Sequence, residues 1–310
     1  METIRINADT KPGAPLAATI GFFDGVHIGH RHLIGQVEDV ARRQGLRPAV
    51  ITFDRHPRQV VKSDHHPMLL STFGEKLRLL DGVGVDLCAV LPFNEEAAAM
   101  SAHDFMLDVL ARRLGVRTLV IGYDNRFGHN RSEGFDDYVA FGREMGISVV
   151  KANPLLVNGV AISSSVVRSL LQEGEVDLAA QCLGRHYAIG GTIVHGKHIG
   201  TGMGFPTANL RPDSTDKLVP ANGVYAVEAR IDGDDTPHAA VMNIGTRPTF
   251  SGTETTLEAH LLNFQGDIYG QGMAISFVAR LRAERKFRSG TELANQLRRD
   301  AEQAKAMLGA

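Results

Sequence analysis

The feature that most constrains the fold is the stretch over residues 19–30, TIGFFDGVHIGH. It begins as an apolar run with β character, turns at Asp24, and then presents two histidines, His27 and His30. An amphipathic helix pattern follows, with apolar residues on one face at Leu33, Ile34, Val37, Val40 and Ala41. A strand, a glycine-containing turn and a helix in this order aim free backbone N–H groups and the positive helix end at a phosphate. The stretch therefore predicts a nucleotide-triphosphate site.

Two histidines three positions apart also allow other interpretations. They can be surface turn residues, or they can be a pair of zinc ligands. The cysteines, Cys88 and Cys182, are isolated and the sequence contains no H-E-x-x-H, which disfavours zinc. The H-x-G-H spacing lies where a strand meets a helix, the context that a phosphate motif requires. We therefore interpret His27 and His30 as phosphate-binding groups, with Gly29 leaving room for the phosphate.

The bulk properties exclude several classes of protein. A chain of 310 residues is long enough for two domains, each with its own core. The formal net charge is -2, so we expect no nucleic-acid partner. No apolar run approaches the roughly 20 residues of a membrane span, the N-terminus lacks an apolar signal core, and two distant cysteines form no disulfide framework. We expect a cytoplasmic protein without a membrane partner, and the sequence does not indicate its oligomeric state.

The first half alternates strand and helix patterns. Strand patterns follow the first run at 49–53, 86–93, 118–122 and 147–151. Helix patterns lie between them at 75–83, 101–114 and 136–145. Continuous apolar strands separated by helices indicate βαβ units and a parallel sheet, with the ligand beyond the carboxyl ends of the strands. We expect residues 1–183 to form this α/β domain.

Polar residues follow these predicted strands. After the second strand and in the loop 122–128 they are Asp54, His56, Pro57, Asp124, Asn125 and Arg126. The segment 162–168, ISSSVVR, follows the fifth strand and predicts a second phosphate site, since Ser163, Ser164 and Ser165 offer hydroxyls and Arg168 lies one turn further. Alone, that segment also fits an ordinary capped helix, and Asp24, Asp54 and Arg126 also fit turn residues.

With these motifs the first half resembles the H-x-G-H nucleotidyltransferases, and specifically the FMN adenylyltransferase module of bacterial FAD synthetases. The resemblance implies that FMN and ATP give FAD and pyrophosphate. It implies ATP contacts at Gly21, Phe22, Asp24, His27, Gly29, His30, Ser163, Ser164, Ser165 and Arg168. It implies flavin contacts at Asp54, His56, Pro57, Asp124, Asn125 and Arg126. The chain departs from the family with Ser165 for Thr, Ala161 for a basic residue and Asn125 for Phe.

The second half reads as strands without intervening helices. The strand patterns lie at 187–194, 223–231, 238–244, 256–264 and 273–281. Their spacing indicates a small antiparallel barrel. A helix over 289–308 closes the chain, with a capping spacing at Ser289 and Glu292 and an apolar stripe at Leu293, Leu297, Ala301, Ala304 and Leu308. We expect residues 184–310 to form this second domain.

The informative stretch of the second half is GKHIGTGMGFPTANL over 196–210. This stretch contains the glycines Gly196, Gly200, Gly202 and Gly204. Glycines of such a loop can wrap phosphates with backbone N–H groups, although a plain hairpin loop fits as well. Thr207 and Asn209 alternate on one face of an extended segment, so both oxygens can meet one metal ion. The alternative is that they bond only to backbone.

Five further motifs accompany this stretch: NGVY at 222–225, NIGTRPTF at 243–250, LEAH at 257–260, DIYG at 267–270 and RAERKF at 282–287. With them, this half resembles riboflavin kinase. The resemblance implies a six-stranded barrel, Mg-ATP bound at Thr207 and Asn209, and Glu258 as general base. Its implied ATP and flavin contacts are Gly196, Gly200, Gly202, Gly204, Phe205, Pro206, Thr207, Asn209, Asn243 and Arg282. A carboxylate can accept the proton of a riboflavin hydroxyl, although Glu258 alone also fits an exposed strand position.

We therefore expect a bifunctional, Mg²⁺-dependent enzyme with a Rossmann-like α/β domain followed by a six-stranded antiparallel barrel and a C-terminal helix. Its second half would phosphorylate riboflavin to FMN and release ADP, and its first half would convert FMN to FAD. Two alternatives remain open. The first half can transfer AMP or CMP to another phosphate, and the protein can be a flavin or nucleotide sensor without turnover.

Overall fold

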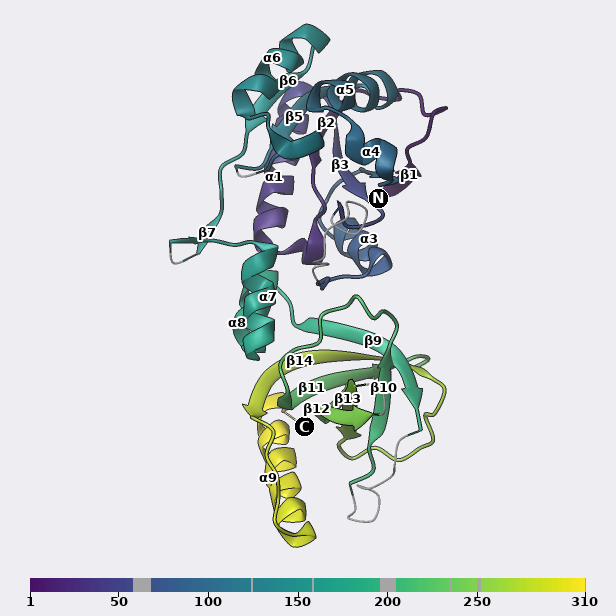
Figure 1. Ribbon diagram of the computed structural model, residues 1–310, viewed down its shortest axis with the longest axis vertical. Coiled ribbons are helices and arrows are strands. Elements are labelled where there is room, and N and C mark those ends of the chain that lie inside the picture. Colours follow the sequence, from purple (N-terminus) through teal and green to yellow (C-terminus); the bar gives the residue numbers. More distant parts are fainter. Residues whose placement is uncertain are drawn as a thin grey trace. The chain divides into compact units, whose positions relative to one another are not determined.

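The computed structural model describes residues 1–57, 68–123, 125–157, 159–195, 205–234, 236–249 and 252–309. Its internal contacts divide the chain into two compact units, Met1–Ser164 and Ser165–Ala310 (Figure 1). The residues over 165–183, which we grouped with the first domain on sequence, belong by these contacts to the second unit. The domain bounds 1–183 and 184–310 stay a prediction.

A parallel sheet forms the centre of the first unit. In the described residues its strands are β1 (Glu2–Arg5), β2 (Leu16–Ile20), β3 (Arg47–Phe53), β4 (Leu87–Leu91), β5 (Val116–Ile121) and β6 (Ser148–Lys151). Their order is β1-β4-β3-β2-β5-β6, and all neighbours pair in parallel. This confirms the predicted sheet. In this sheet the sequence analysis missed β1, which lies at the edge beside β4 and lacks an apolar run.

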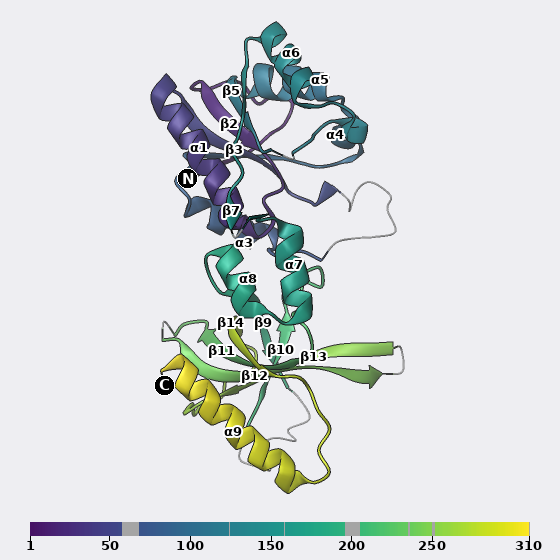
Figure 2. The same ribbon diagram turned by 90° about the vertical axis from the view of Figure 1, so that its left-hand side faces the viewer.

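Helices cover both faces of this sheet. They are α1 (Ile28–Gln44), α3 (Phe73–Asp81), α4 (Glu95–Ala99), α5 (Ala102–Asp104), η2 (Phe105–Arg113) and α6 (Phe135–Met145). Figure 2 shows α1 on one face of the strands and α5 and α6 on the other. Short helical turns η1 (Asp24–Val26) and η3 (His129–Arg131) and a hairpin of β7 (Leu156–Val157) and β8 (Val160–Ala161) complete the unit.

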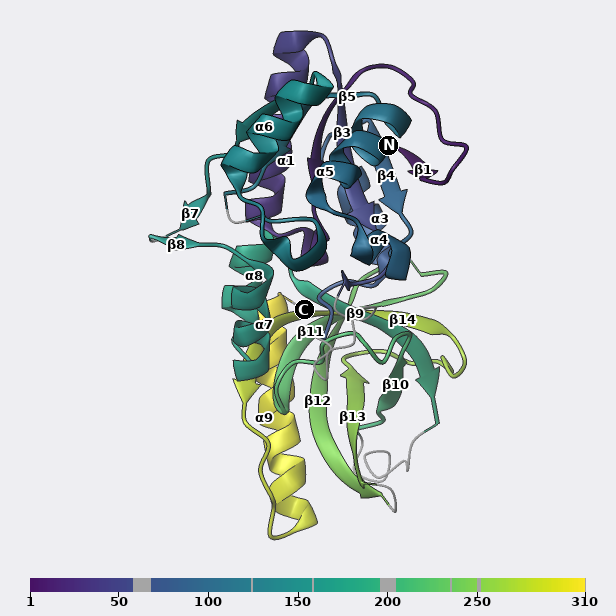
Figure 3. The same cartoon turned by 45° about the horizontal axis from the view of Figure 1, so that its top comes forward.

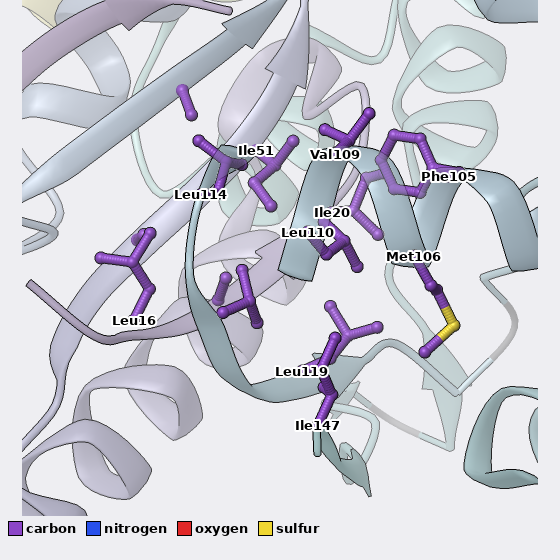
Figure 4. Packing of buried hydrophobic residues seen from close by; sticks show 14 of the residues in the cluster. Leu16, Ile20, Ile51, Phe105, Met106, Val109, Leu110, Leu114, Leu119 and Ile147 are labelled. Atoms are coloured by element: carbon purple, nitrogen blue, oxygen red, sulfur yellow. The ribbon is translucent and has the colours of Figure 1, made fainter. Parts of the chain in front are cut away.

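The alternation of side chains explains why β2 and β4 are buried along their whole length. Ile20 and Ile51 point to one face, where they pack with η2 residues such as Val109 (Figure 4). Ala17 points to the other face and packs against Val37 of α1. Successive strand side chains point to opposite faces, so helices on both sides of the sheet bury every position of a central strand such as β2.

The second unit contains a closed antiparallel barrel in the order β10-β13-β12-β11-β14-β9. The strands are β9 (Tyr187–Val194), β10 (Ala208–Pro212), β11 (Gly223–Ile231), β12 (His238–Thr249), β13 (Gly252–Leu261) and β14 (Gly272–Arg282). The barrel that the resemblance implied is confirmed. The strand patterns alone identified five of these strands and left β10 as an extended segment, because β10 has only five residues.

Helices pack on the outside of this barrel. The helix α9 (Gly290–Leu308) packs beside β11 and β12 (Figure 3). Its residues Ala301 and Ala304 share a buried cluster with Val224 and Val241. Two further helices, α7 (Ser164–Glu173) and α8 (Val176–Leu183), precede β9. Arg280 of β14 donates to the carbonyl oxygen of Glu173 at 3.0 Å and so ties the end of α7 to the barrel. In the part of the chain that the structure describes, no helix is long and apolar enough to cross a membrane.

Candidate active sites

The turn between β2 and α1 has a backbone that few sequences tolerate. Phe23, Gly25 and Val26 all have positive φ angles, of 56°, 75° and 40°. Such angles cost energy in residues with a Cβ, so they persist only where the surrounding structure holds them in place. They are found most often at binding and active sites. Phe23 is held by its buried ring, which packs edge-on against the His30 ring at a centroid distance of 5.1 Å. The turn is therefore held by packing at the start of α1.

The two predicted histidines lie together at the N-terminus of α1. The Nδ1 of His27 accepts a hydrogen bond from the His30 backbone N–H at 3.2 Å and caps the helix. The two rings stack with centroids 3.6 Å apart. Burial, followed by the charges of His27 and Lys76, lowers the pKa of His30 well below its usual value, so this ring is neutral near pH 7. Among the described residues its buried Nδ1 has no hydrogen-bond partner.

The serine segment approaches the same turn. Ser164 Oγ donates to the carbonyl oxygen of Asp24 at 3.0 Å. A Cβ on Gly29 would lie 2.8 Å from the carbonyl oxygen of Ile162. Gly29 therefore permits close contact between two chain segments, a role that we did not predict beside the expected room for phosphate. Ser163 and Ser164 are thus close to the histidine turn, whereas Ser165 and Arg168 belong to the second unit.

Asp24 has a structural role that its sequence context did not reveal. Its carboxylate is only 3% exposed and accepts hydrogen bonds from the backbone N–H groups of Leu70 and Ser71, each at 3.0 Å. Ser71 Oγ in turn accepts from the N–H of Gly25 at 3.0 Å. These bonds connect the segment before α3 to the histidine turn. Gly21, at the start of that turn, donates its backbone N–H to the Ile51 carbonyl oxygen. Whether Asp24 also contacts ATP stays a prediction.

The residues expected to contact a flavin follow β3. Asp54 accepts from the Phe93 N–H at 2.9 Å and from Arg5 Nη2 at 2.6 Å. The ring of His56 lies edge-on to that of Phe22, with centroids 4.6 Å apart. Pro57 follows directly in the sequence. Two predicted sites, the ATP contact Phe22 and the flavin contact His56, are therefore adjacent.

The loop after β5 is fastened to the end of β2. Asn125 Nδ2 donates to the Ile20 carbonyl oxygen at 2.6 Å, and its N–H donates to Gly122 at 3.0 Å. Asn125, which replaces the aromatic residue of the family pattern, therefore binds backbone next to the histidine turn. Arg126 is exposed, and Asp124 lies outside the described residues.

Lys76 is a residue that the sequence analysis missed. It lies on α3, its side chain is 2% exposed, and its Nζ donates to the Phe53 carbonyl oxygen at 2.7 Å. Burial lowers its pKa to about 8, against the opposing effects of nearby Asp24, Cys88 and Asp54. A signal was available, because Lys76 occupies the face of the helix that also carries Phe73 and Leu80, where an apolar residue is expected.

In the second unit, three polar residues of the candidate site form one row across neighbouring strands. Asn209 on β10 pairs with Glu258 on β13, and Glu258 pairs with Asn243 on β12. Residues directly opposite each other on antiparallel strands point to the same face. The adjacent positions Ala208, Ala259 and Met242 are buried inside the barrel, so this row, here called the outer row, lies on its outer face.

Neighbouring side chains hold the outer row in place. His260 Nδ1 is 2.8 Å from the Pro206 carbonyl oxygen, and its ring contacts that of Phe205 at a centroid distance of 5.1 Å. These contacts fix the segment that carries Thr207 beside β13. Arg247 Nη2 is 3.7 Å from Glu258 Oε1, and the two side chains are 36% and 30% exposed. Neither His260 nor Arg247 was a candidate on sequence.

Arg282, an expected nucleotide or flavin contact, forms an ion pair with Asp300 within the second unit. Its Nε and Nη2 donate to the Asp300 carboxylate at 3.1 and 2.7 Å. Asp300 is 2% exposed and also accepts from Gln296. The pair joins β14 to α9. The predicted glycine contacts lie outside the described residues; they are Gly196, Gly200, Gly202 and Gly204. Within the described residues, no group of three His, Cys, Asp or Glu side chains is placed to hold a metal ion.

Comparisons with known proteins cover both units. A family model described as FAD synthetase matches residues 10–166, and one described as riboflavin kinase matches residues 183–308. The chain is 37% identical over 303 residues to the bifunctional riboflavin kinase/FMN adenylyltransferase of Escherichia coli strain K12, covering 98% of this chain and 96% of that one. The protein of that description from Bacillus subtilis is 35% identical over 292 residues, covering 92% and 90%.

A solved structure is similar over almost the whole chain. It is a crystal structure described as a macrolide-efflux protein from Streptococcus pneumoniae, with a TM-score of 0.89 and 28% identity. The match covers 98% of each chain.

Proposed function

The chain belongs to the family of bifunctional riboflavin kinase/FMN adenylyltransferases, and from this premise we propose which of its residues carry the two activities. The enzyme phosphorylates riboflavin to FMN with ATP and adenylylates FMN to FAD with release of pyrophosphate. The observation that carries the assignment is the outer row, in which Glu258 lies between Asn209 and Asn243. The outer row presents the Glu258 carboxylate between two amide side chains on the outer face of the barrel, where Glu258 is 30% exposed.

In the kinase step Glu258 acts as the general base. It accepts the proton of the riboflavin hydroxyl as that oxygen attacks the γ-phosphorus of ATP, and ADP leaves with the electrons of the broken bond. The neighbouring amides of Asn209 and Asn243 orient the phosphate and the flavin side chain. Phe205 and Pro206, held by His260, border the same place.

The residues present suit a magnesium ion. Mg²⁺ binds oxygen ligands and usually shares them with water and substrate phosphates. Thr207 offers a hydroxyl oxygen and Asn209 an amide oxygen, two positions apart in a segment that His260 and the pairing of β10 hold against β13. Thr207 and Asn209 would hold the ion together with the phosphates of ATP. When bound, it neutralises charge on those phosphates.

In the adenylyltransferase step the protein positions reactants and neutralises charge. A phosphate oxygen of FMN attacks the α-phosphorus of ATP in line, and pyrophosphate leaves. The N-terminus of α1 and the neutral ring of His30 donate hydrogen bonds to the phosphates, beside His27. Ser163 and Ser164 contribute hydroxyl groups at this turn, where Ser164 donates to the Asp24 carbonyl oxygen. For Ser165 and Arg168 the family resemblance alone supports phosphate contacts. The adjacent rings of Phe22 and His56 support the assignment of this edge to FMN and ATP.

We also propose a cytoplasmic location, without a nucleic-acid or membrane partner. The free thiols Cys88 and Cys182 support it, because reducing compartments keep cysteines unpaired.

One experiment tests the two-activity proposal directly. The purified enzyme is incubated with riboflavin, ATP and Mg²⁺, and the flavins are separated over time. We expect FMN first and FAD second, and FAD directly when FMN is added instead. FMN that accumulates without FAD would contradict the assignment of the first unit, and absence of any conversion would contradict both assignments.

A further inference from the structure

A buried ammonium group lies beneath the edge where Phe22 and His56 meet. Lys76 Nζ is 2.7 Å from the Phe53 carbonyl oxygen and 3.9 Å from the centroid of the Phe22 ring. A second ring, that of Phe73, has its centroid 5.5 Å from the same nitrogen. Burying an ammonium costs free energy unless partners compensate it, and one carbonyl and two ring faces are such partners.

These contacts join the ends of two neighbouring strands. Phe22 follows β2 and leads into the turn with His27 and His30, whereas Phe53 ends β3 and leads to Asp54 and His56. Because β2 and β3 are parallel neighbours, their carboxyl ends lie at one edge of the sheet. One ammonium group on α3 therefore holds two of the chain segments that carry proposed adenylyltransferase contacts.

Titratable groups from several neighbouring elements lie near the Lys76 ammonium group. The carboxylates of Asp24 and Asp54 favour its charged form. Cys88 on β4 is a neutral thiol, because burial raises its pKa to about 11. On α1, His30 is neutral, partly because the charge of Lys76 lowers the His30 pKa. Lys76 is thus the basic group whose charge changes near pH 8 at this edge.

We propose that Lys76 is a positioning residue of the adenylyltransferase site, whose ammonium group fixes the Phe22 ring and the end of β3 in the geometry that FMN and ATP require. The inference rests on the proposed function of the first unit. Lys76 does not touch the reacting atoms, since the Phe22 ring and the Phe53 carbonyl group cover its nitrogen.

The test replaces Lys76 by Met, which keeps the length of the side chain and removes its charge. FAD formation from FMN should fall by about 10- to 100-fold, because displaced contact groups lose catalysis steeply. Phosphorylation of riboflavin should stay at the wild-type rate, because that step belongs to the second unit. The matched control is Lys151→Met, which removes an exposed ammonium that lies 5.6 Å from the Phe135 ring and should leave both activities unchanged.

Two further measurements separate positioning from simple packing. In K76M the His30 pKa, measured by NMR, should rise because a nearby positive charge is lost. In wild type, FAD formation should fall as pH rises through about 8, where Lys76 loses its proton. Lys76→Arg, which stays charged, should abolish that fall, and it also serves if K76M does not fold.

The outcomes are distinct. Wild-type enzyme that makes no FAD contradicts the proposed function itself. Wild-type enzyme that makes FAD, together with a folded K76M variant of unchanged KM and kcat for FAD formation, overturns the role of Lys76 alone. An unchanged fall through pH 8 in K76R also overturns it.

Discussion

Glu258 lies directly opposite Asn209 in the antiparallel pair of β13 and β10. Side chains at opposite positions share a face, with Cβ atoms about 5 Å apart. Ligands of the Asn209 amide are therefore within reach of the Glu258 carboxylate. Because β12 continues the same row with Asn243, a phosphate and a hydroxyl can be held side by side there.

Glu258→Gln tests the base assignment in the kinase. The amide keeps the shape of the side chain but cannot accept the proton, so FMN formation should fall by about 10²- to 10⁴-fold. FAD formation from added FMN should remain at the wild-type rate, since that step belongs to the first unit. Separation of flavins after timed incubation measures both. The control is Glu228→Gln on β11, outside the outer row, and near-normal FMN formation in E258Q would refute the assignment.

Gly29→Ala tests the close approach of the serine segment to α1. The added methyl group would lie 2.8 Å from the Ile162 carbonyl oxygen, so the segment with Ser163 and Ser164 must shift. FAD formation should fall by about 10- to 100-fold, with riboflavin phosphorylation unaffected.

The same helix provides a matched control for that substitution. A Cβ on Gly35 would meet no atom within 4 Å. Gly35→Ala should therefore keep FAD formation and stabilise the first unit by about 0.5–1 kcal/mol, because alanine favours the helix. Equal activities in the two alanine variants would show that the contact with Ile162 is unimportant.

The lowered pKa of His30 makes stability depend on pH. As pH falls below the ordinary value of 6.5, the unfolded chain binds a proton at this position while the folded ring stays neutral. The free energy of unfolding should therefore decrease between pH 6.5 and the lowered pKa. Urea unfolding followed by circular dichroism measures this dependence, which should be weaker in His30→Gln. The exposed His32 on the same helix is the control, and His32→Gln should keep the wild-type slope.

The ion pair of Arg282 and Asp300 should stabilise the attachment of α9 to the barrel. Asp300→Ala leaves the guanidinium group of Arg282 without its buried carboxylate, which should cost about 3 kcal/mol of unfolding free energy. The double variant with Arg282→Met should lose less than the sum of the two single changes, because no uncompensated charge remains. Additive losses in urea unfolding would mean that the pair is not coupled.

Much of the fold follows from local periodicity. The apolar stripe of Leu33, Ile34, Val37, Val40 and Ala41 predicted α1, and all of these residues are buried except Leu33, which is partly buried. The alternation along β13 predicted a strand with Glu258 turned away from Leu257 and Ala259. The edge strand β1 escaped prediction because its partner β4 lies far along the chain and one-sided pairing needs no apolar run.

The sequence by itself determined the elements and the chemical types at their ends, because periods of two and 3.6 residues are local properties of the chain. The histidine turn was recognisable for that reason, whereas the serine segment and Glu258 were assigned through the family resemblance of their motifs. Only the tertiary structure decided which of these side chains meet. Strand register placed Asn209 and Asn243 on either side of Glu258, and packing of α3 brought Lys76 beneath Phe22. Such contacts join distant positions, so no local pattern contains them.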